Sequence, residues 1–379
     1  MLLTILFNTY LKCRRNIFSS AYIESLIKVK YYRMKNIIFF IIVIILSSCK
    51  RTNQGKEIII ENRIINPVIH RIEVKQLLNV DKIGVYDTLS VFINRGTDSI
   101  FYMYDSSDFT YKGACGGIGN GPEDFQFPFF LSKADSNNGI INLYDVNAAA
   151  FKEINVKKLF RKEPNAIVSK KMPALLIGSP DLHLKNDSCF IGNIDSGSGL
   201  YFIYDSNEDK INWVEFPKIL QSPQGEFTVM NMNRITLNFE SDKVVSAMGY
   251  YNLLFLYNSE NELIKTIQLG YDEIRPTVVG GYHISGDNFI CCREIKSSDK
   301  AVYVLEQNIR EKDFEKADNA PSRIVVFDWN LKYLKTYLLP HYSLGFVYDE
   351  SRNRILYTAL NSEGGTDVYF FCLDEDNIK

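Results

Sequence analysis

The sequence predicts an all-β fold, a six-bladed β-propeller whose blades are four-stranded antiparallel sheets. Three observations lead to this prediction: one short unit resembles a β-hairpin, the unit recurs along the chain, and its copies are about one propeller blade apart. The clearest copy is Arg323 to Pro340, in which two apolar runs flank a polar turn at Asp328, Trp329 and Asn330. β-branched and aromatic residues fill both runs without a helical period, so the unit indicates the outer hairpin of a small sheet.

Six copies of the unit align on an aromatic or apolar residue followed by Asp or Asn. They are FYMYD at Tyr104-Asp105, INLYD at Tyr144-Asp145, YFIYD at Tyr204-Asp205, LFLYN at Tyr257-Asn258, IVVFD at Phe327-Asp328 and FFCLD at Leu373-Asp374. Successive copies lie 40 to 70 residues apart, whereas a propeller blade takes about 40 to 50 residues. We expect insertions in the polar stretches 157–171 and 307–322. The phase of the second copy stays open, because INLYD also fits the strand before the hairpin. A seven-bladed ring or a large sandwich is the alternative.

The last copy ends almost at Lys379, which leaves no sequence for the outer strand of its blade. Four-stranded sheets packed radially around an axis need that strand to close the ring. The apolar run Glu57 to Ile65 supplies it in our prediction. An N-terminal strand in the last blade would then close the propeller.

Along the chain, residues 1–33 come first, and we predict that they are a non-native upstream extension. They are basic, with a patchy apolar pattern, and a second initiator-like methionine follows at Met34. An amphipathic cytoplasmic tail is the alternative. In both cases the segment is left out of the fold prediction.

Residues 34–48 have the layout of a secretory signal peptide. Lys35 precedes an apolar core from Ile37 to Leu46, and two serines separate this core from Cys49. This ending resembles the bacterial lipoprotein signal, in which the cysteine is lipidated and becomes the mature N-terminus. The core is shorter than the roughly 20 residues of a spanning helix, which speaks against the alternative of an uncleaved anchor. We therefore predict lipidation at Cys49.

A tether over residues 49–56 and the propeller over residues 57–379 complete the predicted organisation. The chain has 43 basic and 45 acidic residues, a net charge of −2 that argues against a nucleic-acid partner. Aromatic residues make up 13% of the sequence, and we expect most of them to pack between blades, with sugar or protein contact as their second use. We expect a monomer without a cofactor.

Five cysteines follow the signal: Cys115, Cys189, Cys291, Cys292 and Cys372. An odd and scattered set is not typical of a disulfide framework. Strand alternation would point the adjacent pair Cys291 and Cys292 to opposite faces, so a metal site there is not expected. We predict buried free thiols.

The loop Gly113 to Pro128, GACGGIGNGPEDFQFP, is the most distinctive segment. Its glycines permit positive φ and close backbone approach, which would suit a cradle for an anion. No Lys-Ser/Thr follows, and no strand–loop–helix context supports a nucleotide loop. The favoured interpretation is a tight link from the outer edge of one blade to the inner strand of the next, pinned by Pro122 and Phe125.

Part of this loop carries a family resemblance. The Gly-x-Gly-x-Gly-Pro-Glu-x-Phe turn, formed by Gly117, Gly119, Gly121, Pro122, Glu123 and Phe125, follows the first hairpin. Together with the signal ending in cysteine and the FYMYD-like copies, it resembles the six-bladed propeller lipoproteins of Bacteroidetes, which are similar to TolB-like and NHL-like propellers. The resemblance covers the chain from about Cys49 onward. It implies the fold and a lipid-anchored place in the cell envelope, at the outer membrane, but no activity.

Three histidines stand on candidate innermost strands: His183 in DLHLKN, His283 in GGYHISG and His341 in PHYSLGF. The segments CFIGNI, NFICCRE and RILYTAL follow them as candidate second strands. If all three histidines faced the axis, they could hold a divalent metal or share acid–base chemistry. A single strand histidine is more often packed or solvated, so we favour no metal site and no firm catalytic residue.

Carboxylates in the hairpins suit turn formation better than catalysis. Asp105, Asp108, Asp205, Asp209 and Asp328 recur at turns, where Asp side chains bind their own backbone. No Asp-x-Asp-x-Asp-Gly loop supports calcium, and no Gly-x-Ser-x-Gly elbow supports a nucleophile.

Two functional hypotheses follow. The first is a lipid-anchored binding or scaffold module of the envelope for a protein or glycan partner. The second is a hydrolase or lyase that acts on polysaccharide or peptide at the channel mouth. Convergence of His183, His283 and His341 would distinguish the second from the first, which we favour.

Overall fold

The computed structural model describes residues 55–74, 79–86, 88–95, 97–133, 139–195, 197–220, 232–279, 283–314 and 320–373. All of them belong to one compact unit, Gln54–Lys379. The predicted extension, the signal peptide and Cys49 lie outside the described residues. Among the described residues, no helix has the length and hydropathy needed to cross a bilayer.

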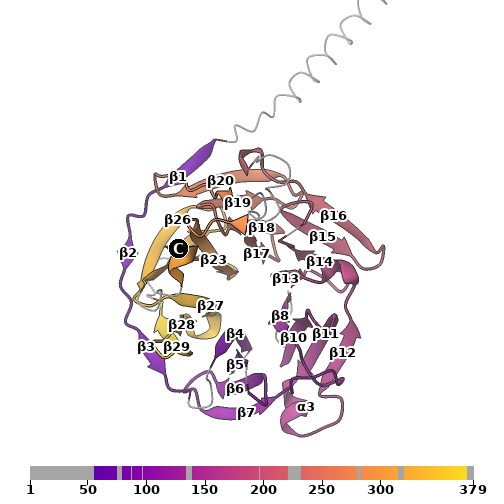
Figure 1. Ribbon diagram of the computed structural model, residues 1–379. Coiled ribbons are helices and arrows are strands. Elements are labelled where there is room, and N and C mark those ends of the chain that lie inside the picture. Colours follow the sequence, from indigo (N-terminus) through magenta and orange to yellow (C-terminus); the bar gives the residue numbers. More distant parts are fainter. Residues whose placement is uncertain are drawn as a thin grey trace, which may run out of the picture. The chain divides into compact units, whose positions relative to one another are not determined.

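The unit is a ring of six blades around a central axis (Figure 1), and each blade holds four antiparallel strands. The predicted fold class is therefore confirmed. From the innermost strand outward, blade 1 is β4 (Val80–Tyr86), β5 (Leu89–Asn94), β6 (Phe101–Asp105) and β7 (Tyr111–Cys115); blade 2 is β8 (Pro128–Phe130), β10 (Ile140–Asp145), β11 (Ala150–Asn155) and β12 (Ile167–Lys171); blade 3 is β13 (Leu182–Leu184), β14 (Cys189–Gly192), β15 (Tyr201–Asp205) and β16 (Lys210–Val214).

The second half of the ring follows the same order. Blade 4 is β17 (Asn233–Asn238), β18 (Lys243–Met248), β19 (Leu253–Tyr257) and β20 (Leu263–Leu269); blade 5 is β23 (Phe289–Ser297), β24 (Ala301–Arg310), β25 (Ser322–Asp328) and β26 (Tyr333–Leu339); blade 6 is β27 (Ser343–Asp349), β28 (Arg354–Leu360), β29 (Thr366–Cys372) and β3 (His70–Ile72).

A few short elements lie outside this pattern. They are β9 (Ser132–Lys133), which runs parallel to β13, the two-stranded sheet β21 (Val278–Val279) and β22 (His283–Ile284), helix α3 (Val156–Phe160), and the 3₁₀ turns Ala174–Leu176, Lys218–Leu220 and Glu350–Arg352.

The geometry that the outer hairpins share explains why the repeated motif ends in Asp or Asn. In blades 1, 3, 4 and 5 the side-chain oxygen of this residue accepts a hydrogen bond from the backbone N–H two residues on, at 2.8–3.1 Å: Asp105 from Ser107, Asp205 from Asn207, Asn258 from Glu260 and Asp328 from Asn330. Each turn then places one residue at positive φ before the next strand. The predicted turn role of Asp105, Asp205 and Asp328 is confirmed, because these bonds satisfy the turn backbone.

The second copy of the motif is one strand out of phase with the others. INLYD lies in β10, the second strand of blade 2, whereas the other five copies lie in third strands. Of the two phases left open by the sequence, the strand before the outer hairpin is the correct one. The stretch 157–171, predicted as an insertion, contains most of α3 and all of β12, the outer strand of that blade.

An N-terminal strand closes the ring, as predicted, but it is not the predicted segment. β3 pairs antiparallel with β29 and completes blade 6. The run Glu57 to Ile65 instead forms most of β1 (Lys56–Ile59) and β2 (Ile64–Ile65), which pair in parallel with β20 and β26. Residues 55–72, here called the N-terminal belt, therefore follow the outer edges of blades 4, 5 and 6 in turn (Figure 1).

The core lies between the blades. In the described part of the chain six hydrophobic clusters form, and each draws its residues from two neighbouring blades. Among the largest fully buried side chains are Tyr104, Tyr144, Tyr201, Tyr303, Tyr337, Tyr342 and Tyr357. The predicted packing role of the aromatic residues is confirmed. Each fully buried large apolar side chain contributes about 1.5–3 kcal/mol to this association.

The five cysteines of the described chain are free thiols. Cys291 and Cys292 are buried as predicted, while Cys115 and Cys189 are half-buried and Cys372 is exposed, which the prediction of buried thiols missed. Register shifts on both sides of Cys292 interrupt the alternation of β23. Simple alternation therefore does not apply to this cysteine pair.

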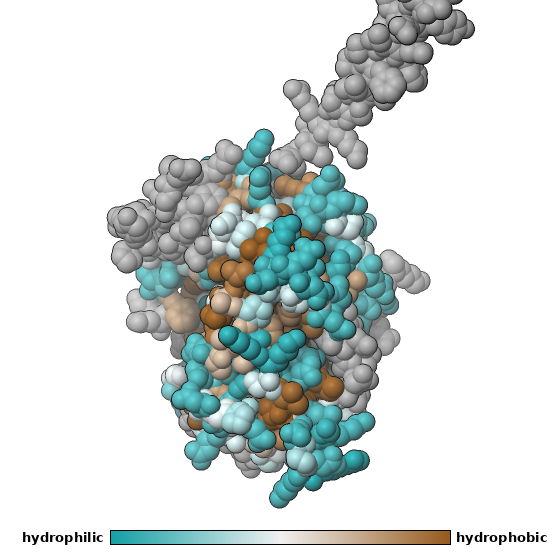
Figure 2. Space-filling model, turned by 90° about the vertical axis from the view of Figure 1, so that its right-hand side faces the viewer, coloured by the Kyte–Doolittle hydropathy of each residue, from teal (hydrophilic) through white to brown (hydrophobic). Residues whose placement is uncertain are grey.

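The side of the ring seen in Figure 2 is mostly hydrophilic, and its apolar residues form separate areas rather than one continuous face. A continuous exposed apolar patch would mark an interaction surface. The described residues on this side of the ring form no such patch.

Candidate functional site

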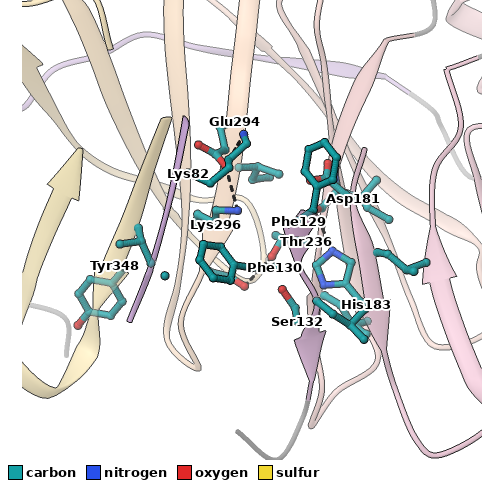
Figure 3. Close-up of a pocket in the computed structure, with 18 of the residues that line it drawn as sticks. Lys82, Phe129, Phe130, Ser132, Asp181, His183, Thr236, Glu294, Lys296 and Tyr348 are labelled. Carbon is teal, nitrogen blue, oxygen red and sulfur yellow. Dashed lines mark hydrogen bonds and ion pairs between the residues drawn. The ribbon is translucent and has the colours of Figure 1, made fainter. Parts of the chain in front are cut away.

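A cavity of about 300 Å³ lies in the central channel, here called the channel cavity. The innermost strands of all six blades contribute to its wall (Figure 3). The main contributors are Lys82–Tyr86 on β4, Phe129–Ser132 at β8, Asp181–His183 at β13, Ile235–Leu237 on β17, Glu294–Ser297 on β23 and Val347–Tyr348 on β27.

Glu294 joins three blades at this cavity. Its Oε1 lies 3.0 Å from the Lys296 ammonium on the same strand and 3.6 Å from that of Lys82 on blade 1. Its Oε2 accepts the backbone N–H of Phe346 on blade 6 at 2.8 Å. A Cβ on Gly345 would stand 2.6 Å from Oε2, so a larger residue at this position would displace the carboxylate.

These contacts hold Glu294 ionised. Burial alone would raise its pKa, but Lys296, Lys82 and the Phe346 N–H outweigh burial and lower the pKa to about 2. Burial would lower the pKa of Lys296. The nearby carboxylates of Glu294 and Asp181 outweigh burial and raise the pKa of this ammonium. Both partners are therefore charged at neutral pH.

His183 and Asp181 belong to the wall formed by blade 3 (Figure 3), and both bind the backbone of Ile235 on blade 4. The Asp181 carboxylate accepts the Ile235 N–H at 3.1 Å, and His183 Nε2 lies 3.2 Å from the Ile235 carbonyl oxygen. A carbonyl only accepts, so Nε2 carries the proton and Nδ1 presents a lone pair. Nδ1 is buried and has no hydrogen-bond partner in the part of the chain that the structure describes.

Burial lowers the pKa of His183, although Asp181 and the Ile235 carbonyl act in the opposite direction. The imidazole is therefore neutral at pH 7 and Nδ1 remains an acceptor. His183 is 7% exposed, which makes an unsatisfied ring nitrogen costly.

The charged residues of the channel cavity balance. Two ammonium groups, Lys82 and Lys296, face two carboxylates, Asp181 and Glu294, among its lining residues. The side chains of Lys82 and Lys296 keep 30% and 35% of their surface exposed, and that of Glu294 only 7%. A hydroxyl pair, Thr236 and Ser297 at 2.7 Å, connects blades 4 and 5 at the same level of the wall.

Of the other two candidate histidines, the structure shows His341 away from the site of His183. His341 precedes β27 and does not line the channel cavity. Its Nδ1 shares a hydrogen bond with the Tyr357 hydroxyl at 3.0 Å, and its ring stacks on that of Tyr369 with the centroids 4.2 Å apart. His283 lies on β22, not on an innermost strand as predicted, and its side chain lies outside the described residues. The predicted second strand NFICCRE is the start of β23, the innermost strand of blade 5.

Within the described ranges, no group of three or more His, Cys, Asp or Glu side chains is arranged to hold a metal ion. The three-histidine hypothesis keeps only His183 at the channel cavity, and the part that concerns the His283 side chain stays a prediction.

The glycine-rich loop surrounds a carboxylate of its own chain. The Gly121 N–H donates to Asp124 Oδ2 at 2.9 Å. Added Cβ atoms at Gly117, Gly119 and Gly121 would stand 3.0, 2.4 and 2.7 Å from the Asp124 carboxylate oxygens. The place considered for a ligand anion therefore holds Asp124.

The loop joins β7 of blade 1 to β8 of blade 2, and Phe125 fixes it. Phe125 is fully buried and meets Phe101 edge-on at 4.7 Å. The Lys152 ammonium lies 4.4 Å from the Phe125 ring and donates to the Asp124 carbonyl. Pro122 and Glu123 are exposed.

A second cavity of about 470 Å³ lies between blades 4 and 5 and includes Arg234, Tyr250, Arg293 and Glu311. Burial and Glu311 raise the pKa of Tyr250 to about 12. Its mixed charges come from two blades only, whereas all six blades build the channel cavity.

Sequence reasoning missed Lys82, Glu294 and Lys296. A usable signal existed: Glu294 and Lys296 stand two residues apart in a β-rich run, so alternation places them on one face. Charged residues at such positions of an innermost strand point to the channel.

Comparisons with known proteins agree with the fold. Residues 81–351 match the family described as TolB-like 6-blade propeller-like. In structure, the chain is similar to a member of the DUF4221 family from Bacteroides vulgatus, with a TM-score of 0.55 and 11% identity over 85% of this chain and 99% of the other. It is also similar to a putative exported protein from Bacteroides fragilis, with a TM-score of 0.51 and 11% identity over 84% and 98%. No curated protein matches the sequence.

Proposed function

The chain belongs to the family of TolB-like six-bladed propellers, and we propose that it is a lipid-anchored binding module of the cell envelope that takes a glycan partner at its channel cavity. One observation carries the binding proposal. All six innermost strands build a cavity in which Lys82, Lys296 and Glu294 pair with one another. In the same wall, His183 Nδ1 is buried without a hydrogen-bond partner among the described residues.

The size of the cavity favours a glycan over a folded protein partner. A volume of about 300 Å³ is at the lower end of small-molecule sites, which span about 300–1,000 Å³. One sugar residue of a chain fits this scale, and the aromatic rings of Phe129, Phe130 and Tyr86 supply apolar wall for it.

The charge state of the wall favours binding over acid–base catalysis. Glu294, with a pKa of about 2, is a poor proton donor at neutral pH. The carboxyl whose pKa lies near neutrality, Glu306 at about 7, lies on β24 and does not line the channel cavity.

The envelope location rests on the signal and on the similar structures. Residues 34–48 have the layout of a lipoprotein signal that ends at Cys49, and one structural neighbour is described as a putative exported protein. We expect palmitate labelling of the wild-type protein in cells and its recovery in the membrane fraction. Cys49→Ser should abolish both; a wild-type protein without label would contradict the anchor.

The binding proposal is tested with the full chain, solubilised in detergent, on an array of envelope and host oligosaccharides. We expect selective capture by the wild type and at least a tenfold loss in His183→Phe. His341→Phe makes the same exchange outside the channel cavity and should bind like the wild type.

Three results would overturn the proposal. They are capture of no glycan, equal capture by His183→Phe, and release of shortened glycan products, which would support the hydrolase or lyase hypothesis instead.

A further inference from the structure

The channel cavity carries chemical information about which sugar it takes, and this inference rests on the proposed glycan-binding function. We propose that the channel cavity is selective for an uncharged sugar residue that donates a hydroxyl hydrogen bond to His183 Nδ1. Three features of the wall lead to this conclusion.

The first feature is the unpaired acceptor. His183 Nε2 is committed to the Ile235 carbonyl at 3.2 Å, which fixes the tautomer and leaves Nδ1 as a buried lone pair that no described residue pairs with. A ligand satisfies it only with a donor, and a sugar hydroxyl is such a donor. Leaving this nitrogen unpaired costs about 1–3 kcal/mol, so a ligand that pairs with it gains affinity.

The second feature is the charge balance. Lys82 and Lys296 share the Glu294 carboxylate, and Asp181 is held by the Ile235 N–H and lies in the field of Lys296 and Arg234. A uronate would compete with Glu294 for the lysines and face both carboxylates. An ammonium would face both lysines. Only an uncharged ligand enters without disturbing the pairs.

The third feature is the supply of donors opposite the acceptor. The side chains of Lys82 and Lys296 are partly exposed. An ammonium has three N–H donors, so the shared Glu294 carboxylate does not use all of them. The hydroxyls of Ser132, Thr236 and Ser297 also line the cavity. Sugar hydroxyls both donate and accept, so they match a wall with this mixture.

Isothermal titration of the detergent-solubilised full chain tests the selectivity. The probes are D-glucose, D-galactose and D-mannose, each compared with its uronate and its 2-amino sugar. We expect at least one uncharged hexose to bind at least tenfold more tightly than both charged counterparts. His183→Phe should weaken this hexose at least tenfold, and His183→Asn, which keeps an acceptor, should restore part of the loss.

Charge variants give a readout that a purely structural role would not produce. Glu294→Gln leaves the wall with one excess positive charge, so the ratio of uronate to hexose affinity should rise at least tenfold. Lys82→Met leaves one excess negative charge and should shift the ratio toward the amino sugar. Because Lys82 is partly exposed, this second variant remains informative if Glu294→Gln does not fold.

The outcomes separate this inference from the proposed function. A uronate or amino sugar that binds the wild type as tightly as its hexose overturns the selectivity, while glycan capture on the array still stands. Equal hexose binding by wild type and His183→Phe overturns the role of Nδ1. Failure of every probe to bind overturns the inference, and the array then decides the proposed function separately.

Discussion

Asp145 and Asp328 hold the same place in two copies of the repeated motif, but their carboxylates bind different groups. Asp328 accepts the N–H groups of Asn330 and Lys332, at 2.8 and 2.9 Å, within its own exposed turn. Asp145 is fully buried and accepts the N–H groups of Gln126 and Phe127, both at 2.8 Å, from the glycine-rich loop. The buried Lys152 ammonium lies 3.6 Å away.

Asp145→Ala should therefore destabilise the protein far more than Asp328→Ala. The first variant leaves two backbone donors and a buried ammonium without their carboxylate, which costs about 3–5 kcal/mol. The second loses turn hydrogen bonds and costs about 1 kcal/mol. Urea unfolding followed by circular dichroism measures both, and equal losses would contradict the distinction.

Glu306 makes stability depend on pH near neutrality. Burial raises its pKa to about 7, helped by Glu61 and only partly offset by Arg323 at 2.8 Å. The unfolded value is about 4.3, so the folded state binds the extra proton between these two values. Stability should fall as pH rises from about 4.3 to 7, by on the order of 3 kcal/mol.

Glu306→Gln should remove this pH dependence. The free energy of unfolding of the variant should therefore rise relative to that of the wild type as the pH increases from about 4.3 to 7. Denaturant titrations at pH 4.5 and 8 measure the difference. Glu294→Gln is the control of opposite sign, and because its effect falls below about pH 4.3 a further titration near pH 3 measures it. The pKa of Glu294 is lowered to about 2, so its stabilisation is present above about pH 4.3 and is lost only as pH falls toward 2. Parallel curves for wild type and Glu306→Gln would refute the prediction.

At the scale of residues, the sequence predicted part of the site. His183 was identified because a histidine in a short β-run is chemically conspicuous. Lys82, Glu294 and Lys296 were not, because a charged residue in a strand carries no information about which blade faces it. Their pairing joins blades 1, 5 and 6, and only the closed ring brings those strands together.

Single elements show where strand assignment fails. The β10–β11 hairpin has the motif of the outer hairpins, but its strands are the second and third of blade 2. The outer strand, β12, follows α3 in a stretch with little apolar pattern. The sequence pattern predicts β23 as a second strand, because the segment of β21 and β22, which form a separate two-stranded sheet, precedes it. Local pattern identifies strands, whereas their order in a blade depends on pairing across long intervals.

The β10–β11 hairpin also offers a stabilising change. Ala149 has a φ of 48°, a left-handed conformation that costs a residue with a Cβ about 1–2 kcal/mol. Glycine avoids this cost but has more unfolded-state entropy. Ala149→Gly should therefore raise the free energy of unfolding by about 0.5–1 kcal/mol, as measured by thermal unfolding.

Ala150 is the control for this change. It is the next residue, it begins β11 and it is buried, so Ala150→Gly should lose about 1 kcal/mol. A loss in both variants would mean that the backbone at Ala149 is not strained.

For the whole molecule, each blade depends on its neighbours. The hydrophobic clusters each draw on two neighbouring blades, and the cluster between blades 6 and 1 includes Ile72 of β3. The need for closure by an N-terminal strand followed from the missing outer strand of the last motif copy. Which segment closes the ring did not follow, because the three belt strands are all short and none has a distinctive pattern.

The belt thus contains two kinds of strand, and truncation should separate them. β1 and β2 add a parallel edge to blades that already have four strands. Ion pairs of Lys56 with Glu273 at 2.7 Å and of Glu57 with Lys265 at 2.8 Å hold β1 in place. β3 instead completes blade 6, where His70 stacks on Phe370 and Arg71 binds Asp367 at 2.8 Å.

A chain that starts at residue 67 should keep one cooperative unfolding transition at a lower temperature, because the ring stays closed. A chain that starts at residue 79 should lose cooperativity, since β29 becomes an open edge and the contact between blades 6 and 1 loses Ile72. Hydrogen exchange should then show fast exchange first in β28 and β29. If both truncations unfold alike, β3 is not needed to keep the ring closed, and the stability of the propeller must come from the blades individually.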